Sequence, residues 1–216
     1  FDQMLFYLPL SGSTFKKVYY DDLLERAVSK FVPADDLIVP YTATSLDDAE
    51  AVIHVVKMSE NELRKQMVSG FYSDIELTKP TDTVTNELEE KEREVEGLTK
   101  SQRVDAMYTI LECHVNLDLE GFEDLGPDGE PTGIKLPYVV TIEEGSRRVL
   151  SIRRNFAPND PKKNKIQYFV HFKFLPGLGF YGLGLIHMIG GLSRTATAAL
   201  RQLLDAGTLS NLPAGF

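Results

Sequence analysis

Short apolar runs separated by turn-forming residues dominate the first part of the chain. The runs at residues 5–8 and 15–20 flank a short Gly-containing turn, and this arrangement predicts a β-hairpin. Further extended segments are predicted at 36–39 and 51–56, where β-branched and apolar residues again cluster. We therefore expect residues 1–58 to form a β-rich portion.

The polar spacing after this portion indicates the start of a helix. Ser59 and Glu62 have the S-x-x-E spacing of a capping box, in which the hydroxyl and the carboxylate each satisfy a backbone amide. Leu63 and Met67 fall on one helical face, and Gly70 is expected to mark the end of the helix.

The composition changes between residues 79 and 100. The run 86–97 is acidic, and from residue 86 to residue 98 only Leu88, Val95 and Leu98 are apolar. A helix with so few apolar positions has little surface to bury. Residues 59–106 are therefore expected to be a first helical region in which the segment 79–100 is acidic and mobile.

Alternation of apolar and polar residues returns near Met107. Residues 107–117 place an apolar set on one face and a mixed set on the other, which predicts a half-buried antiparallel strand. Further strands are predicted at 138–142, 148–153 and 167–174, separated by turns rich in Gly, Pro and Asp. We expect residues 107–183 to contain these strands as a small antiparallel meander.

A helix of about 20 residues, roughly 30 Å long, is predicted from near Gly184 to Asp205. Gly207 is expected to end it, within a final region of residues 184–216. Its small residues would let a neighbouring helix approach closely. Its apolar face is predicted to consist of Ile186, Ile189, Leu192, Ala196, Leu200 and Leu203, and its small residues are Gly190, Gly191, Ala196, Ala198 and Ala199.

The run 175–192 has almost no charge and is only just long enough to cross a bilayer. It is rich in Gly and contains Pro176 and His187. We therefore expect a buried turn that leads into the last helix, and no membrane partner.

The composition changes this picture in two respects. With 43% hydrophobic and 25% charged residues, the chain is typical of a folded protein, and its net charge of −9 argues against a surface that holds nucleic acid by neutralising phosphates. Cys113 is the single cysteine, so no disulfide forms within the chain. The chain begins at Phe1 and ends at Phe216, and we expect it to be a fragment of a longer protein.

Two motifs resemble binding sites but lack their context. Residues 177–182 match G-x-G-x-x-G, yet no second parallel strand follows, so a dinucleotide site is not expected. Residues 116–121 resemble the start of a calcium-binding loop, but Pro127 occupies the position that requires a bidentate Glu. No nucleophile elbow and no metal-ligand spacing occurs in the sequence. We expect no enzyme activity, no catalytic residue, no cofactor and no metal.

A basic group within the predicted meander is the main candidate for function. Solvated lysines and arginines at a strand edge are the ordinary interpretation, because they discourage aggregation. The alternative is a docking surface for protein partners, in which exposed apolar residues are bordered by charge. The predicted docking residues are Phe122, Leu125, Arg147, Arg148, Arg153, Arg154, Lys162 and Lys163.

The order of these segments resembles that of portal proteins of tailed bacteriophages, of the podovirus-like class. Residues 31–50 and 52–59 resemble the wing-to-stem region of that family, with an extended Pro-acidic-acidic-apolar segment leading through a strand into a capped helix. Residues 167–184 resemble the exit from its clip domain. Residues 211–216 resemble the approach to its tunnel loop.

The resemblance implies an α+β fold with a β-rich wing portion, helical stem segments and an inserted small antiparallel clip domain. It implies a structural ring subunit, a dodecamer when full length, at the capsid portal vertex of the virion and in the host cytoplasm during assembly. The implied partners are the terminase large subunit, tail adaptor proteins, and genomic DNA that passes through the channel without sequence-specific binding. The alternatives are a phage tail adaptor or baseplate module, and an oxidoreductase that uses the Gly-rich loop.

Overall fold

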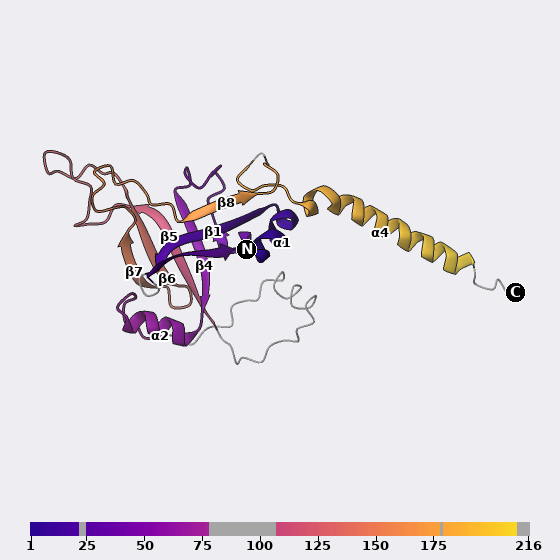
Figure 1. Cartoon of the computed structure of the whole chain (residues 1–216), viewed down its shortest axis with the longest axis horizontal. Helices are drawn as coiled ribbons and strands as arrows, with labels where there is room; N and C mark the ends of the chain where they lie inside the picture. The colour runs from indigo at the N-terminus through magenta and orange to yellow at the C-terminus, as the bar shows by residue number, and fades with distance from the viewer. Residues whose placement is uncertain (22–24, 78–106, 178, 211–216) are drawn as a thin grey trace. The chain divides into compact units, whose positions relative to one another are not determined.

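The structure, a computed structural model, describes residues 1–21, 25–77, 107–177 and 179–210. The predicted acidic segment 79–100 and the predicted tunnel-loop approach 211–216 lie outside the described residues. The fold is α+β, as expected, with helices and two antiparallel sheets (Figure 1). The chain divides into two compact units: unit 1 comprises Phe1–Ala34, Thr44–Leu46 and Tyr168–Phe216, and unit 2 comprises Asp35–Ala43 and Asp47–Gln167.

Unit 1 is built on a three-stranded antiparallel sheet with the strand order β2-β1-β8. Its core centres on Phe15, which is fully buried and whose ring lies 4.3 Å from the ring of His171 and 5.9 Å from that of Phe180. The elements of the unit are α1 (Asp2–Ser11), β1 (Ser13–Asp21), β2 (Arg26–Val32), β8 (Phe169–Lys173) and α4 (Leu185–Ser210).

The expected strand at residues 5–8 is wrong, because these residues belong to helix α1. The helix ends at Gly12, which has a φ of 88° and donates its N–H to the carbonyl oxygen of Leu8. Gly readily adopts this left-handed conformation and so ends helices. The hairpin forms instead between β1 and β2. A run of four apolar residues does not by itself distinguish a strand from a helix.

Unit 2 is built on a five-stranded antiparallel sheet with the order β3-β4-β5-β6-β7. The strands follow the chain order across the sheet, and the long connection between β4 and β5 contains α2. The elements are η1 (Ala34–Asp36), β3 (Leu37–Ile38), β4 (Ala51–Met58), α2 (Glu60–Val68), β5 (Tyr108–Leu117), β6 (Leu136–Glu143) and β7 (Arg148–Arg154).

The capping box predicted at Ser59 is confirmed. The Ser59 hydroxyl accepts the N–H of Glu62, and the Glu62 carboxylate accepts the N–H of Ser59, both at 3.3 Å. Helix α2 then buries Leu63 and Met67 against the sheet. Gly70 follows the end of the helix with a φ of 74°.

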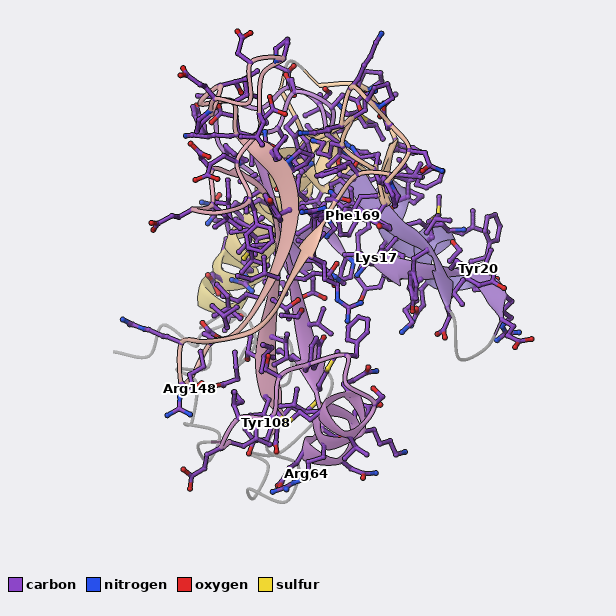
Figure 2. The ribbon with its side chains drawn as sticks, turned by 90° about the vertical axis from the view of Figure 1, so that its left-hand side faces the viewer. Lys17, Tyr20, Arg64, Tyr108, Arg148 and Phe169 are labelled. Atoms are coloured by element: carbon purple, nitrogen blue, oxygen red, sulfur yellow. The ribbon has the colours of Figure 1, made fainter. Side chains whose placement is uncertain are left out.

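Hydrophobic clusters cover both faces of this sheet. On the α2 face, Leu63 packs in a cluster with Tyr108, Ile110 and Leu150. On the other face, the cluster contains Leu136, Tyr138 and Val140, against which Cys113 and Val115 pack. Strand β5 therefore has neighbours on both faces, where the alternation predicted a single buried face. Figure 2 shows Tyr108 near the α2 residue Arg64, at one end of this sheet.

Two expectations for the C-terminal part need correction. The strand predicted at 167–174 exists as β8, but it pairs with β1 and not with the meander. Its partner strand is more than 150 residues earlier in the sequence, so no local pattern reveals the pairing. The last helix begins as predicted but continues to Ser210, and Gly207 lies within it. A single Gly inside a helix weakens it by only about 1 kcal/mol, which need not end it.

Candidate docking surface

The connection between β5 and β6, residues 118–135, is a loop fixed by its own backbone. The N–H of Gly126 donates to the carbonyl oxygen of Glu130 at 2.9 Å, and that of Thr132 donates to Asp124 at 2.8 Å. A β-bridge joins Leu125 to Pro131. The loop therefore presents its side chains from a defined backbone.

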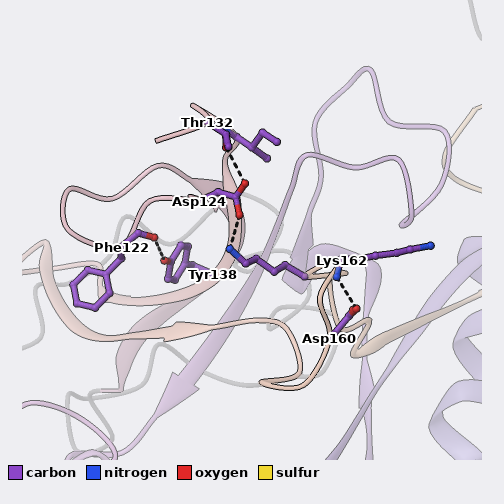
Figure 3. Close-up of polar contacts among 8 residues, drawn as sticks. Phe122, Asp124, Thr132, Tyr138, Asp160 and Lys162 are labelled. Atoms are coloured by element: carbon purple, nitrogen blue, oxygen red, sulfur yellow. Dashed lines mark hydrogen bonds and ion pairs between the residues drawn. The ribbon is translucent and has the colours of Figure 1, made fainter. Parts of the chain in front are cut away.

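Asp124 ties this loop to the segment 155–167 that follows β7 (Figure 3). Its carboxylate accepts the hydroxyl of Thr132 at 2.8 Å and forms a short ion pair with the ammonium of Lys163. The hydrogen bond from Lys163, followed by that from Thr132, lowers the pKa of Asp124 below its ordinary value. The carboxylate is therefore ionised at neutral pH and holds the two segments together.

The segment 155–167 is shaped by a second aspartate. Asp160 accepts the backbone N–H groups of Lys162 and Asn164, each at 2.9 Å. These hydrogen bonds from Asn164 and Lys162 lower the pKa of Asp160, because they stabilise its charged form. The turn so formed leaves the Lys162 side chain exposed.

Phe122 lies exposed on the loop but is held from two sides. The hydroxyl of the buried Tyr138 donates to the Phe122 carbonyl oxygen at 3.3 Å, and the Arg154 guanidinium lies 5.7 Å from the Phe122 ring centroid. Phe122 is 57% exposed and Leu125 is 58% exposed. Exposed apolar side chains bordered by charge on an ordered loop are typical of protein interaction sites.

Arg147 and Arg148 lie at the other end of β7: Arg147 lies in the turn between β6 and β7, and Arg148 is the first residue of the strand. Strand β7 begins at Arg148 and ends at Arg154, a separation of about 20 Å at the usual rise per residue. The buried carboxylate of Glu143 shapes the turn by accepting the N–H groups of Gly145 at 2.9 Å and Ser146 at 2.6 Å. Figure 2 shows Arg148 at the same end of the sheet as Tyr108.

Arg153 faces the opposite side of the sheet from Arg154, because successive strand residues alternate. Its guanidinium donates to the Phe71 carbonyl oxygen at 2.8 Å and lies 3.5 Å from the Phe71 ring centroid. Arg153 thus fixes the segment after α2.

The structure brings together five of the eight predicted docking residues in one region. It places Arg147 and Arg148 at the far end of β7, and it places Arg153 on the opposite face of the sheet. The five are Phe122, Leu125, Arg154, Lys162 and Lys163, and we call them the loop surface.

The sequence prediction missed Asp124 and Tyr138, which fix the loop surface. Asp124 has an identifiable local signal, since it lies in a stretch rich in Gly, Pro and Asp. Its partner Lys163 is 39 residues away, and no local spacing connects them.

The Gly-rich run 177–182 has a structural role in unit 1. A Cβ on Gly182 would lie 2.5 Å from the Gly12 carbonyl oxygen, and one on Gly184 would lie 2.4 Å from that of Leu10. The N–H of Gly182 also donates to the Ser13 hydroxyl at 2.8 Å. The glycines therefore allow this backbone to pack directly on the junction between α1 and β1.

Helix α4 is exposed from Ile186 to Thr208, including its apolar side chains. Leu192 is 71% exposed and Leu203 is 69% exposed. Among the described residues, no helix is long and apolar enough to cross a membrane. Nor do the described side chains gather three potential metal ligands in one place.

An α+β chain with an ordered, exposed loop surface and an uncovered amphipathic helix has the features of a subunit of a larger assembly. The comparison with protein families identifies that assembly. Residues 17–215 match the family model described as Phage SU10 portal protein, and the chain therefore belongs to this family of phage portal proteins. Among curated proteins, none matches the chain.

Family membership fixes the general role of the chain. It is a structural component of the head-to-tail connector, which is an oligomeric ring at the portal vertex of the virion. The match favours the portal over the tail adaptor or baseplate alternative. The family is structural rather than enzymatic.

Proposed function

We propose that the chain contributes to the portal channel through which the genome is packaged and ejected, and that its loop surface docks the terminase large subunit and the tail adaptor. In this proposal the ring is a dodecamer, assembled in the host cytoplasm before it enters the virion. DNA passes without sequence-specific binding. The net charge of −9 supports free passage, because an acidic subunit attracts few phosphates.

The proposal assigns the family's parts to this fold. Residues 1–58 contribute to the wing, residues 59–106 contain the first stem region, residues 107–183 contain the clip, and residues 184–216 contain the second stem helix, which is α4. Two observations refine these boundaries. Helix α2 packs on the five-stranded sheet, and β8 pairs with β1. We therefore propose that the clip consists of the five-stranded sheet with its loops.

The exposed position of Phe122 on a hydrogen-bonded loop carries the docking proposal. A loop whose backbone is already fixed loses little conformational entropy on binding, and Arg154 beside the Phe122 ring supplies charge for an acidic partner. Terminase and tail adaptor would bind this surface in succession, since both meet the portal at the clip. The two events would then compete for the same side chains.

The test uses full-length portal rings and measures capture of purified terminase and of tail adaptor by pull-down and stopped-flow mixing. Phe122→Ala and Arg154→Glu are expected to weaken or slow capture of both partners. The matched control is Arg153→Glu, because Arg153 lies next to Arg154 in sequence but on the opposite face of the sheet. The same variants are titrated with duplex DNA at low salt.

Equal capture by wild type and Arg154→Glu rings would contradict docking at the loop surface. A large loss of DNA binding with unchanged partner capture would instead favour a nucleic-acid role for the basic residues. Loss of capture by Arg153→Glu alone would move the docking surface to the face that carries α2.

A further inference from the structure

The loop surface is assembled from two loops that are distant in the sequence. Phe122 and Leu125 come from the loop 118–135, whereas Lys162 and Lys163 come from the segment 155–167. Two loops keep a fixed relative position only where contacts join them. The ion pair between Asp124 and Lys163 is such a contact. We call Asp124, Thr132 and Lys163 the clamp.

Asp124 is fixed within its own loop independently of Lys163. Its carbonyl oxygen accepts the N–H of Thr132 at 2.8 Å, and its carboxylate accepts the Thr132 hydroxyl, also at 2.8 Å. The Thr132 hydroxyl in turn accepts the N–H of Ile134 at 3.3 Å. The Asp124 carboxylate therefore has a defined direction. Figure 3 shows it joined to Thr132 on one side and to a lysine ammonium on the other.

Lys163 has a backbone conformation that residues other than Gly rarely adopt. Its φ is 50°, which lies in the left-handed region and is strained by the Cβ. The turn at Asp160 holds this conformation, because the N–H of Lys163 donates to the Asp160 carbonyl oxygen at 3.1 Å and the Asp160 carboxylate accepts the N–H groups of both neighbours of Lys163. Such strain persists only where the surrounding structure enforces it, and it is commonly found at functional sites.

The ion pair is partly shielded from solvent. The side chains of Lys163 and Asp124 are 32% and 18% exposed, whereas in the pair between Arg64 and Glu60 of α2 both side chains are more than half exposed. A shielded pair is less weakened by water and salt than an exposed one. Since Asp124 already neutralises its ammonium, Lys163 offers little charge to an acidic partner.

We propose that Lys163 is a positioning residue of the loop surface: through Asp124 it holds the loop that carries Phe122 in the docking arrangement, and it does not itself contact the partner. The proposal rests on the proposed docking function. A closed clamp fixes the loop before the partner arrives, so less conformational entropy is lost on docking. With the clamp open, docking must also order the loop, and capture weakens. The direct contacts come from the other four residues of the loop surface.

The first measurement is amide hydrogen exchange of full-length rings, read by mass spectrometry. Lys163→Met removes the charge and keeps a long side chain. It should speed exchange in the peptides that contain Gly126 and Thr132 by about fivefold or more, because the hydrogen bonds of these amides depend on the loop staying closed. Lys162→Met is the matched control, since Lys162 is the next residue and its side chain is exposed. It should exchange as wild type does.

The second measurement is capture of purified terminase and of tail adaptor by the same rings. Lys163→Met and Asp124→Asn should each weaken capture by about tenfold, because each opens the clamp. The charge-swapped variant Asp124→Lys/Lys163→Asp rebuilds the ion pair and should recover capture to within about threefold of wild type. If Lys163 contacted an acidic partner directly, reversing its charge would weaken capture further.

Three results would decide against the proposal or its basis. Wild-type exchange of the loop in Lys163→Met would overturn the positioning role, as would a charge-swapped protein that captures no better than Lys163→Met. Loss of capture by Phe122→Ala together with full capture by Lys163→Met would overturn the positioning role alone. Full capture of both partners by Phe122→Ala would overturn the docking function itself.

Discussion

Helices α2 and α4 are both amphipathic, but they differ in what covers their apolar faces. In α2, Leu63 is 0% exposed and packs on the sheet of its own unit, and the capping box satisfies the first turn. In α4, Leu203 is 69% exposed. Helix α4 is held by its own unit only at its base, where Gly184 packs against the junction of α1 and β1.

The difference shows that an amphipathic sequence pattern identifies the apolar face of a helix but does not identify what packs against that face. Most helical stability in proteins comes from packing of the apolar face. For α2 that packing comes from the same chain. For α4 the described chain supplies no such cover from Ile186 to Thr208, so the free energy of unfolding of the single chain should respond very differently to equivalent changes in the two helices.

The largest expected effect is on Leu63. Leu63→Ala should lower the free energy of unfolding of the monomeric chain by about 2–5 kcal/mol, because it leaves a cavity in a well-packed cluster. Leu203→Ala, the matched control in α4, should change it by less than about 0.5 kcal/mol, since the side chain is already in solvent. Denaturant unfolding monitored by circular dichroism measures both. Equal losses would mean that α4 is covered within its own chain.

A pair of glycine variants separates the base of α4 from its body. Gly184→Ala should destabilise unit 1 by about 1–3 kcal/mol, because the new Cβ would lie 2.4 Å from the Leu10 carbonyl oxygen. Gly191→Ala meets no atom within 4 Å and removes a helix-weakening Gly. It should stabilise the helix by about 0.5–1 kcal/mol. We expect Gly184→Ala to lower the melting temperature and Gly191→Ala to raise it. A change in the same direction for both variants would contradict the close packing of Gly184 against α1.

Removing the cap of α2 should change the free energy of unfolding by a smaller amount. Ser59→Ala should cost about 1 kcal/mol, since the N–H of Glu62 loses its acceptor. Ser59→Asp keeps an acceptor oxygen and should restore most of this loss. Urea unfolding midpoints measure the three proteins. If Ser59→Ala and Ser59→Asp were equally stable, the capping box would contribute nothing to the helix.

Sequence patterns predicted most of the elements correctly wherever the signal was local. The capping box at Ser59 and the strands of the meander follow from spacing within a few residues. The run at residues 5–8 was misread because four apolar residues fit either a strand or a helix. The pairing of β8 with β1 depends on contacts between Ser13 and Lys173 at opposite ends of the chain, and nothing local encodes it.

For the candidate site, the sequence indicated which residues are chemically suited to docking but not which lie together. Residues 147, 148, 153 and 154 form a compact basic group in sequence. Strand geometry then spreads them, because an extended strand separates its ends by about 20 Å and alternates its faces. The ion pair between Asp124 and Lys163 depends on the fold of two loops, so it appears only in three dimensions.

The smallest expected effect concerns the base of α4, where His171 lies in the core of unit 1. Its Nε2 lies 3.1 Å from the Ser13 hydroxyl, and its ring centroid lies 4.3 Å from that of Phe15 and 4.8 Å from that of Phe180. Burial, followed by the charge of Lys173, lowers the pKa of His171 to about 4. The folded protein therefore disfavours the protonated ring, whereas the unfolded chain takes up a proton near the ordinary value of about 6.5.

The contribution of His171 to stability is complete above about pH 6.5 and is lost as the pH falls from there towards 4, since the unfolded state binds more protons in that window. The ring is only half-buried, and solvent screening limits the expected loss to less than about 1 kcal/mol. Thermal melts at pH 7.5 and pH 5 should show a larger drop for wild type than for His171→Gln. The glutamine variant loses the ring stacking and melts lower at both values, so the readout is the difference between them. An equal drop in the two proteins would show that protonation of His171 is not coupled to the packing at the base of α4.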